Sequence, residues 1–251
     1  MASKKEERQR RLVQLIKTEG KLPVRELANI LSVTEMTIRR DFEELGTQYN
    51  PELASDLHAE YQGYDLLTAL QKSNDTKVKI GKMAASLIRP DDIISIDTGS
   101  TTARMLPYLP ENYNLTVLCY NTNVLFEIRY KDRIQPLFCG GRYHRNTEMF
   151  ESPEGVQLIE RTRINKAFLS AAGMHKKLGI TCANDYEVLT KNAVIRSSLE
   201  RILLVDSSKF NQVRSSYFCD LSDIHTVITD KGIADDWREL MREKGIALTI
   251  V

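Results

Sequence analysis

Residues 22–45 read LPVRELANILSVTEMTIRRDFEEL, a stretch with two short apolar patterns on either side of a break. Pro23 stands at a first-turn position, where a helix loses nothing from its missing N–H. Ser32 and Val33 interrupt the apolar spacing, and Thr34 is a good N-cap for a helix that follows. The stretch therefore predicts two short helices joined by a tight turn.

The second of these helices carries side chains that suit DNA. Ile38 and Phe42 are four residues apart and face inward, which leaves Thr37, Arg39 and Arg40 largely outward. Arginine can fork onto a guanine or a phosphate, and threonine can reach a base edge or a phosphate. This is the layout of a helix-turn-helix, whose second helix enters the major groove. The alternative is a plain helical hairpin with solvated arginines.

The residues before this segment predict one more helix. An apolar stripe over 12–16 lies inside a charged run, and Gly20 ends it. Residues 1–49 hold ten Lys or Arg against eight Asp or Glu, a net charge of +2. Because this excess is small, any contact with DNA depends on where the charges lie rather than on their sum.

The composition is typical of an ordinary globular protein. The chain has 251 residues, 42% of them hydrophobic and 27% charged, with a formal net charge of +1. No window approaches the roughly 18 to 20 apolar residues that cross a bilayer, and the first residues lack the apolar segment of a secretory signal. The four cysteines are scattered singly, which predicts buried thiols rather than a metal site. We therefore expect a cytoplasmic protein without a membrane contact, a metal or a cofactor.

From residue 75 onward, short β-rich runs alternate with helical segments. This alternation predicts an α/β domain with a mostly parallel sheet covered by helices. The expected strands are 93–96, 115–118, 136–138, 167–170, 202–205, 226–228 and 247–250. The expected helices are 77–88, 101–109, 124–130, 156–161, 187–199 and 235–244. Residues 46–74 show no firm period, so the predicted domains are 1–57 and 75–251, with a linker over 58–74.

Four loops at expected carboxyl ends of strands have the composition of ligand-binding turns. The first, DTGSTT at 97–102, opens a helix, so its hydroxyls and the helix N-terminus could hold an anion. A simple N-capped turn explains these residues as well. The other loops read CGG at 139–141, SAAG at 170–173 and DSSKF at 206–210. Open α/β sheets bind their ligands at this edge, so we expect the four loops to form one site.

Residues 35–42, EMTIRRDF, closely resemble the recognition-helix signature of the DeoR family of bacterial regulators. The four loops resemble that family's phosphate loop, Gly-Gly turn, small-residue loop and Asp-x-Ser-Lys-Phe motif, so the resemblance covers the chain apart from 46–73. The chain departs from the family at Ser32, which is usually Gly, and in 46–64, which lack a Gly-rich hairpin, the wing. The resemblance implies an N-terminal all-α (winged) helix-turn-helix domain and a C-terminal effector domain similar to sugar-phosphate isomerases of the ribose-5-phosphate isomerase type.

Pattern and resemblance together assign roles to individual residues. The expected DNA-binding residues are Thr34, Glu35, Met36, Thr37, Arg39 and Arg40. The expected effector-binding residues are Asp97, Thr98, Gly99, Ser100, Thr101, Thr102, Tyr120, Asn121, Gly140, Gly141, Ala171, Ala172, Gly173, Glu187, Lys191 and Lys209. The spacing of Glu187 and Lys191 is equally that of a helix-surface ion pair, and Lys209 could instead bond loop carbonyls.

The resemblance implies a transcriptional repressor of a carbohydrate or deoxynucleoside catabolic operon, released from double-stranded operator DNA by a phosphorylated sugar. Helix-turn-helix dimers match palindromic operators, so we expect a homo-oligomer. Most of the family has Thr-Asn where this chain has Cys119-Tyr120. A less polar wall suits a sugar without a 2-hydroxyl, so we expect deoxyribose 5-phosphate as the inducer. The alternative is a regulator that responds to another sugar phosphate.

An isomerase with an added helical domain is the competing class. Isomerisation needs a carboxylate base at the sugar carbon. Related isomerases place acidic residues in the loop that reads SAAG at 170–173 here, and this loop has none. Asp97 remains, but it could equally bind sugar hydroxyls, so we expect that the protein is not an enzyme. A structural DNA-binding protein without a ligand is a third class, which the four loops disfavour.

Overall fold

The computed structural model describes residues 4–19, 24–34, 36–38, 40–41, 65–71 and 75–251. The chain divides into two compact units, Met1–Gly63 and Tyr64–Val251. The predicted domain boundaries at 57 and 74, and the region of the predicted wing, fall outside the described residues and stay predictions. None of the described helices is long and apolar enough to cross a membrane.

The first unit is helical where it is described. Helices α1 (Lys4–Glu19) and α2 (Val24–Ile30) lie on either side of residues 20–23, which are outside the described residues, so the roles of Gly20 and Pro23 stay predictions. Residues 36–38 and 40–41 are also helical and belong to the predicted recognition helix. Phe42, which we expected to face inward, lies outside the described residues. The small core of this unit consists of Leu12, Leu27, Ala28 and Ile38.

The turn after α2 explains the departure at Ser32. Ser32 has a φ of +53°, in the left-handed region that favours glycine. Its N–H donates to the Asn29 carbonyl at 3.2 Å, and the Val33 N–H donates to the Ala28 carbonyl at 3.0 Å. This pair of hydrogen bonds is the Schellman arrangement that commonly ends a helix. The left-handed conformation costs a serine roughly 1 kcal/mol, and the packing of the surrounding helices can offset this cost.

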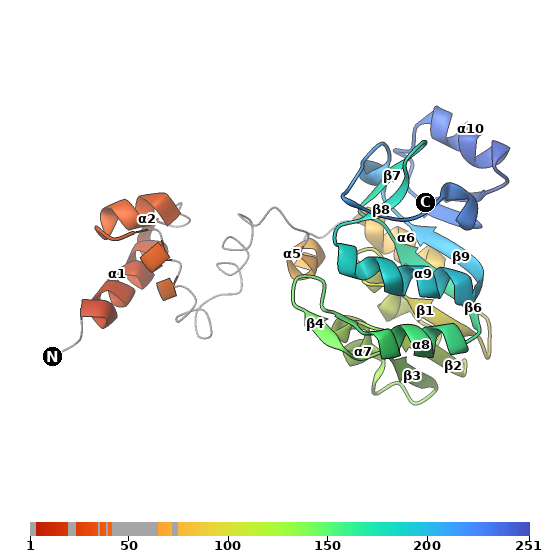
Figure 1. Ribbon diagram of the computed structural model, residues 1–251, viewed down its shortest axis with the longest axis horizontal. Coiled ribbons are helices and arrows are strands. Elements are labelled where there is room, and N and C mark those ends of the chain that lie inside the picture. Colours follow the sequence, from red (N-terminus) through yellow and green to blue (C-terminus); the bar gives the residue numbers. More distant parts are fainter. Residues whose placement is uncertain (1–3, 20–23, 35, 39, 42–64, 72–74) are drawn as a thin grey trace. The chain divides into compact units, whose positions relative to one another are not determined.

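The centre of the second unit is a parallel sheet (Figure 1). Its strands are β1 (Ile93–Ile96), β2 (Leu115–Cys119), β3 (Ile134–Phe138), β6 (Ile164–Ser170), β9 (Ser198–Leu204), β11 (Thr226–Thr229) and β12 (Ala247–Ile250). They lie in the order β12-β11-β9-β6-β1-β2-β3, and every neighbouring pair is parallel. All seven predicted strands are in this sheet, so the predicted α/β fold class is confirmed.

Helices cover both faces of the sheet, and Figure 1 shows α8 and α9 side by side on one of them. The long helices are α6 (Asp75–Ala85), α7 (Thr122–Ile128), α8 (Pro153–Arg161), α9 (Val188–Ser197) and α10 (Asp235–Glu243). The short 3₁₀ helices are η1 (Thr102–Tyr108), η2 (Asp185–Glu187), η3 (Ser207–Lys209) and η4 (Leu221–Asp223). The helix that we predicted over 101–109 is therefore a 3₁₀ helix, and it contains Pro107, which cannot continue an α-helical ladder.

Side chains alternate between the two faces along each strand. On β2, Val117 and Cys119 belong to the apolar cluster shared with α6, η1 and α7. Leu118 and the following Tyr120 belong to the cluster shared with α8, α9 and α10. Successive side chains of extended backbone point to opposite faces, so this alternation follows directly from strand geometry. Both faces are buried, as is usual for parallel sheets.

The sequence did not predict the small antiparallel pieces. Strands β4 (Arg142–His144) and β5 (Met149–Glu151) form a hairpin, and β7 (Gly173–His175), β8 (Gly179–Cys182) and β10 (Ser216–Cys219) form a sheet in the order β10-β8-β7. Strands of three or four residues hold too few side chains to show an alternating pattern.

A helix also occurs inside the predicted linker. Helix α5 (Leu66–Gln71) belongs to the second unit, and its Leu66 is fully buried. The Leu66 N–H donates to the Asn146 carbonyl at 2.7 Å, and the Arg104 guanidinium donates to the Leu70 carbonyl. These contacts attach α5 to the turn of the β4–β5 hairpin and to η1.

Candidate functional site

The predicted ligand loops follow β1, β3, β6 and β9 at one edge of the seven-stranded sheet; β9, β6 and β1 are neighbours, and β2 separates β3 from them. The chain leaves β1 toward β2 and β3, and β6 returns on the other side of β1. Such a reversal of strand order marks the place where open α/β sheets bind ligands. Asp97 directly follows β1, and Ser170 is the last residue of β6, so both residues lie at this point.

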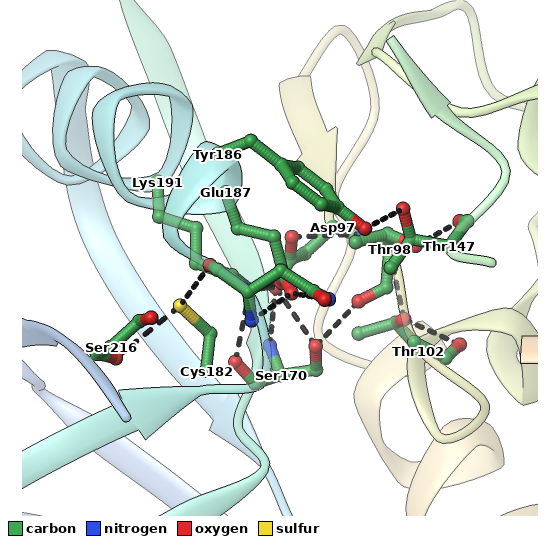
Figure 2. Close-up of polar contacts among 12 residues, drawn as sticks. Asp97, Thr98, Thr102, Thr147, Ser170, Cys182, Tyr186, Glu187, Lys191 and Ser216 are labelled. Carbon is green, nitrogen blue, oxygen red and sulfur yellow. Dashed lines mark hydrogen bonds and ion pairs between the residues drawn. The ribbon is translucent and has the colours of Figure 1, made fainter. Parts of the chain in front are cut away.

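Asp97 is the centre of a buried hydrogen-bond cluster (Figure 2). Its Oδ1 accepts from the Thr98 N–H at 2.8 Å and from the Tyr120 hydroxyl at 2.6 Å. Its Oδ2 accepts from the Ser170 N–H at 2.8 Å, from the Ser170 hydroxyl at 2.9 Å and from the Lys191 ammonium. A carboxylate offers about four lone-pair positions, so these contacts occupy Asp97 fully. Asp97 therefore joins the loops after β1 and β6.

Lys191 places a buried cation next to Asp97. Its side chain, on α9, is 1% exposed, and its Nζ also donates to the Ser170 carbonyl at 3.2 Å. The same atom lies 3.6 Å from a Glu187 carboxylate oxygen and 5.1 Å from the centre of the Phe218 ring. Burial lowers the pKa of this ammonium, but the carboxylates of Asp97 and Glu187 raise the pKa by more, so Lys191 stays charged.

Glu187 completes the charged part of the cluster. Its Oε1 accepts from the Asn184 N–H at 3.2 Å, which is one bond of a capping box, and from the Asn184 side-chain amide at 2.9 Å. Burial raises the pKa of Glu187, and the nearby Lys191 ammonium offsets part of that rise. The alternative of an i,i+4 ion pair with Lys191 is therefore observed, but the pair is buried rather than on the helix surface.

The loop after β1 is tied down by its threonines. The Thr98 hydroxyl donates to the Thr147 carbonyl at 2.7 Å, which fixes the loop to the turn of the β4–β5 hairpin. The Thr102 hydroxyl donates to the Asp97 carbonyl at 2.8 Å and closes the loop on itself. Both threonines are buried. These two hydroxyls fix the conformation of the loop, because each donates its proton to a backbone carbonyl of the protein.

Gly99 and Ser100 occupy different surroundings in the same loop. A Cβ on Gly99 would lie 2.8 Å from the Ser170 Cβ, so the glycine makes room for Ser170. The Ser100 hydroxyl accepts from the Lys77 ammonium at 3.0 Å. Lys77 is on α6, and sequence reasoning missed it, because nothing in its helical pattern separates it from a solvated lysine. Thr101 is buried beside it in the loop.

The two residues after β2 differ sharply in their contacts. Tyr120 is fully buried, and its hydroxyl donates a hydrogen bond to Asp97. Burial and the nearby Asp97 carboxylate raise the pKa of the Tyr120 hydroxyl well above its usual range. Tyr120 therefore holds Asp97 and does not present its hydroxyl to a ligand. Asn121 is also fully buried, but among the described residues neither polar atom of its amide has a hydrogen-bond partner.

Two of the glycines in the other loops, Gly141 and Gly173, pack closely against protein backbone. A Cβ on Gly141 would lie 2.1 Å from the Glu151 carbonyl oxygen, and a Cβ on Gly173 would lie 2.5 Å from the Gln212 carbonyl oxygen. Ala171 and Ala172 are half-buried, and the Ala172 N–H bonds β8. Gly140 is exposed with open space at its Cα. These glycines thus serve the antiparallel pieces that the sequence did not predict.

Lys209 ends η3, in the loop after β9. Its backbone N–H donates to the Asp206 carbonyl at 3.0 Å. Its side chain is half-buried, and in the described part of the chain no acceptor bonds its ammonium. The alternative role, a structural lysine that bonds loop carbonyls, is therefore not observed among those residues.

A polar layer that the sequence did not reveal surrounds the cluster. The Tyr186 hydroxyl donates to the Asn146 amide oxygen at 2.8 Å and lies 3.1 Å from the Thr147 hydroxyl. The Tyr186 ring stacks on His144 with 3.6 Å between the ring centres. The hairpin turn therefore connects η2 with the loop after β1. These residues fall in irregular segments, where no periodic pattern marks a contact.

The predicted DNA-binding residues of the first unit are largely on its surface. Met36 is 76% exposed, Thr34 and Arg40 are exposed, and Thr37 is half-buried. The Thr37 N–H donates to the Thr34 hydroxyl oxygen at 3.2 Å, which confirms the predicted N-cap. The two other predicted residues, Glu35 and Arg39, lie outside the described residues.

An ion pair fastens α1 to the recognition helix. Asp41 is 1% exposed and accepts from the Arg8 guanidinium at 2.9 Å and from the Gln9 amide at 3.3 Å. Burial works to raise the pKa of Asp41, but the hydrogen bond and charge of Arg8 outweigh burial and lower it. Asp41 is therefore a positioning residue for the helix that carries the exposed side chains.

Comparison with known proteins agrees with this architecture. The chain matches the DeoR-like helix-turn-helix domain over residues 8–50 and the DeoR C terminal sensor domain over residues 72–231. It is 30% identical to the deoxyribose operon repressor of Escherichia coli K12 over 99% of both chains. It is 25% identical to the HTH-type transcriptional regulator IolR of Bacillus subtilis, over 93% of this chain and 94% of the relative.

Among solved structures, ribose 5-phosphate isomerase A from Methanocaldococcus jannaschii aligns with 54% of each chain at 19% identity and a TM-score of 0.40. A similarity of this size carries no functional argument. The two family matches and the full-length relatives carry the assignment instead. The chain belongs to the DeoR family of transcriptional regulators.

Proposed function

We propose that the protein represses transcription by binding operator DNA through its first unit, and that a sugar phosphate bound at the β1–β6 edge releases it. The observation that carries the proposal is the buried cluster around Asp97, which joins the loops after β1 and β6 with Tyr120 and Lys191 at the position where open α/β sheets bind ligands. Family membership supplies the DNA-binding part of the function.

The phosphate of the ligand belongs near the cations of this edge. Lys77 reaches the loop after β1 through Ser100, and Lys209 lies in the loop after β9. A phosphate monoester carries nearly two negative charges at neutral pH and binds where lysines and hydroxyls converge. Lys191 is the third cation, but Asp97 and Glu187 already balance its charge. The loops around Ser100 and Lys209 are therefore the proposed phosphate end.

The same geometry disfavours catalysis. A general base must have a lone pair available for the proton that it removes. The Asp97 oxygens accept hydrogen bonds from Thr98, Tyr120, Ser170 and Lys191 and have none left. We therefore infer that Asp97 organises the site and does not abstract protons from a sugar.

Deoxyribose 5-phosphate is the proposed inducer, because the full-length relative with 30% identity is a repressor of a deoxyribose operon. The position of Tyr120 adds nothing to this choice, since its hydroxyl bonds Asp97. An operon for carbohydrate or deoxynucleoside catabolism is the corresponding target. Another sugar phosphate is the alternative that the experiment below distinguishes.

The experiment has two steps. A DNA sequence is first selected from a random duplex pool by the full-length protein. The protein bound to that DNA is then titrated with deoxyribose 5-phosphate, ribose 5-phosphate, fructose 6-phosphate and inorganic phosphate, with fluorescence anisotropy as the readout. We expect deoxyribose 5-phosphate to release the DNA at the lowest concentration. Release at lower concentration by another sugar phosphate would contradict the inducer, and no release by any of them would contradict ligand control.

We also propose a homo-oligomer, because two recognition helices that read a palindromic site require a two-fold arrangement. The selected DNA sequence provides the test. Two inverted half-sites about 10 base pairs apart, or a multiple of that distance, agree with a dimer. A single half-site bound by one chain would contradict it.

A further inference from the structure

In the turn after β2, three buried polar atoms have no hydrogen-bond partner among the described residues. Asn121 is fully buried, and among the described residues neither its amide oxygen nor its amide nitrogen meets a hydrogen-bond partner. The buried amide oxygen of Asn123, at the start of α7, also has no partner in the part of the chain that the structure describes. Most buried polar groups in proteins are hydrogen-bonded, because an unmade bond is costly. Three such atoms in two neighbouring side chains therefore point to a missing partner.

The backbone indicates the face on which Asn121 lies. Its φ of −133° and ψ of 145° are those of extended chain, and it bridges to Met149 of β5. Cys119 packs on the side of α6 and η1, and Tyr120 packs on the opposite side, where it bonds Asp97. Alternation then returns Asn121 to the face of α6 and η1. Ser100 and Lys77, which are bonded to each other, lie at the loop before η1 and on α6.

The chemistry of the unpaired atoms specifies the partner. The two amide oxygens accept hydrogen bonds, so they need donors, and the Asn121 nitrogen needs an acceptor. An ionised phosphate offers acceptors and cannot satisfy the oxygens. A hydroxyl offers one donor and two lone pairs and can satisfy both kinds of atom. A molecule with at least two hydroxyl groups fits this set.

We propose that Asn121 and Asn123 form the hydroxyl-binding end of the effector site and make the protein respond to hydroxylated phosphates in preference to plain alkyl phosphates. This inference rests on the proposed function and deepens it. Lys77 and Ser100 bind the phosphate, and the amides of Asn121 and Asn123 form hydrogen bonds with the hydroxyls at the other end of the ligand. The amides are left unpaired until the ligand arrives, so their unmade hydrogen bonds are a cost that ligand binding removes.

The test compares Asn121→Leu with Thr229→Val in the full-length protein. Leucine keeps the branched skeleton of asparagine, with the same number of side-chain heavy atoms, and replaces its amide with two methyl groups. Thr229 is a matched control, because it is fully buried at the end of β11 and its hydroxyl also lacks a partner among the described residues. Binding of deoxyribose 5-phosphate and of propyl phosphate, which has no hydroxyl, is measured by calorimetry. Thermal unfolding without ligand is measured in parallel.

We expect Asn121→Leu to bind deoxyribose 5-phosphate about tenfold to a hundredfold more weakly and propyl phosphate as the wild type does. Its unfolding temperature without ligand should be unchanged or higher, because the variant lacks an unpaired buried amide. Thr229→Val should share the unchanged or higher unfolding temperature and bind both phosphates normally. Asn123→Leu should give the same loss for the sugar phosphate, and it serves as the second variant if Asn121→Leu does not fold.

Two results would overturn the inference separately from the proposed function. If wild type binds the sugar phosphate and both asparagine variants bind it equally well, the amides do not read hydroxyls. If Asn121→Leu unfolds at a lower temperature than wild type and binds the ligand normally, its amide has a structural partner. If the wild type binds neither sugar phosphates nor propyl phosphate, the proposed function itself fails, and the inference fails with it.

Discussion

At the scale of single residues, the charge of Lys191 balances two buried carboxylates, those of Asp97 and Glu187. Replacing Lys191 with methionine keeps the apolar stem and removes the charge. Removal of one partner from a buried ion pair leaves the other uncompensated, which costs about 3 to 5 kcal/mol. We expect Lys191→Met to lose a free energy of unfolding of this size at pH 7, measured by urea denaturation. A loss below about 1 kcal/mol would show that the cluster is not held by charge.

The pH dependence of that variant follows from Glu187. Burial raises the pKa of Glu187 in the folded protein, and the variant lacks the ammonium that offsets the rise. A carboxyl whose folded pKa exceeds its unfolded pKa binds more protons when folded, so its contribution to stability is lost as pH rises through the folded pKa. The penalty of Lys191→Met should therefore be larger at pH 8 than at pH 5. An equal penalty at both pH values would contradict the position of Glu187 beside Lys191.

At the scale of elements, the recognition helix is the part of the first unit expected to contact DNA. Arg40 is exposed on it, and a contact with a base or a desolvated phosphate is worth about 1 to 3 kcal/mol. We expect Arg40→Ala to weaken binding to the selected DNA by that amount at fixed salt. Its unfolding should change by less than about 0.5 kcal/mol, because exposed substitutions rarely do more.

The matched control for this prediction is Arg11→Ala. Arg11 is an exposed arginine on α1 and not on the recognition helix, so its replacement removes the same charge from the same unit. A loss of affinity equal to that of Arg40→Ala would mean that general charge, and not this helix, determines binding.

The elements also show what the sequence could and could not predict. The strands of the large sheet read as short apolar runs bounded by turn signals, so all seven were predictable. Thr34 and Ser32 marked the start of one helix and the end of another through local backbone chemistry. The β4–β5 hairpin and the β10-β8-β7 sheet could not be predicted, because their strands are too short to carry a pattern.

At the scale of the whole molecule, sequence reasoning predicted which loops lie at the carboxyl ends of the sheet strands, but not which of their side chains bond one another. Asp97 and Tyr120 were expected to meet a ligand, and the structure pairs them with each other. Gly99 makes room for Ser170, a contact 71 positions away along the chain that no local pattern reveals. Lys77 was missed for the same reason. Which hydrogen bonds are already used within the protein depends on tertiary structure alone.

The separation of the cluster residues along the chain has a kinetic consequence. Asp97 meets Ser170 across 73 positions and Lys191 across 94, so the cluster can close only after β6 and α9 have joined β1. Contacts between distant segments are slow to form, and interactions absent from the folding transition state mainly change the unfolding rate. Stopped-flow measurements on Lys191→Met should therefore show faster unfolding and a nearly unchanged refolding rate. The cluster then determines the unfolding rate of the second unit, and therefore the lifetime of its folded state.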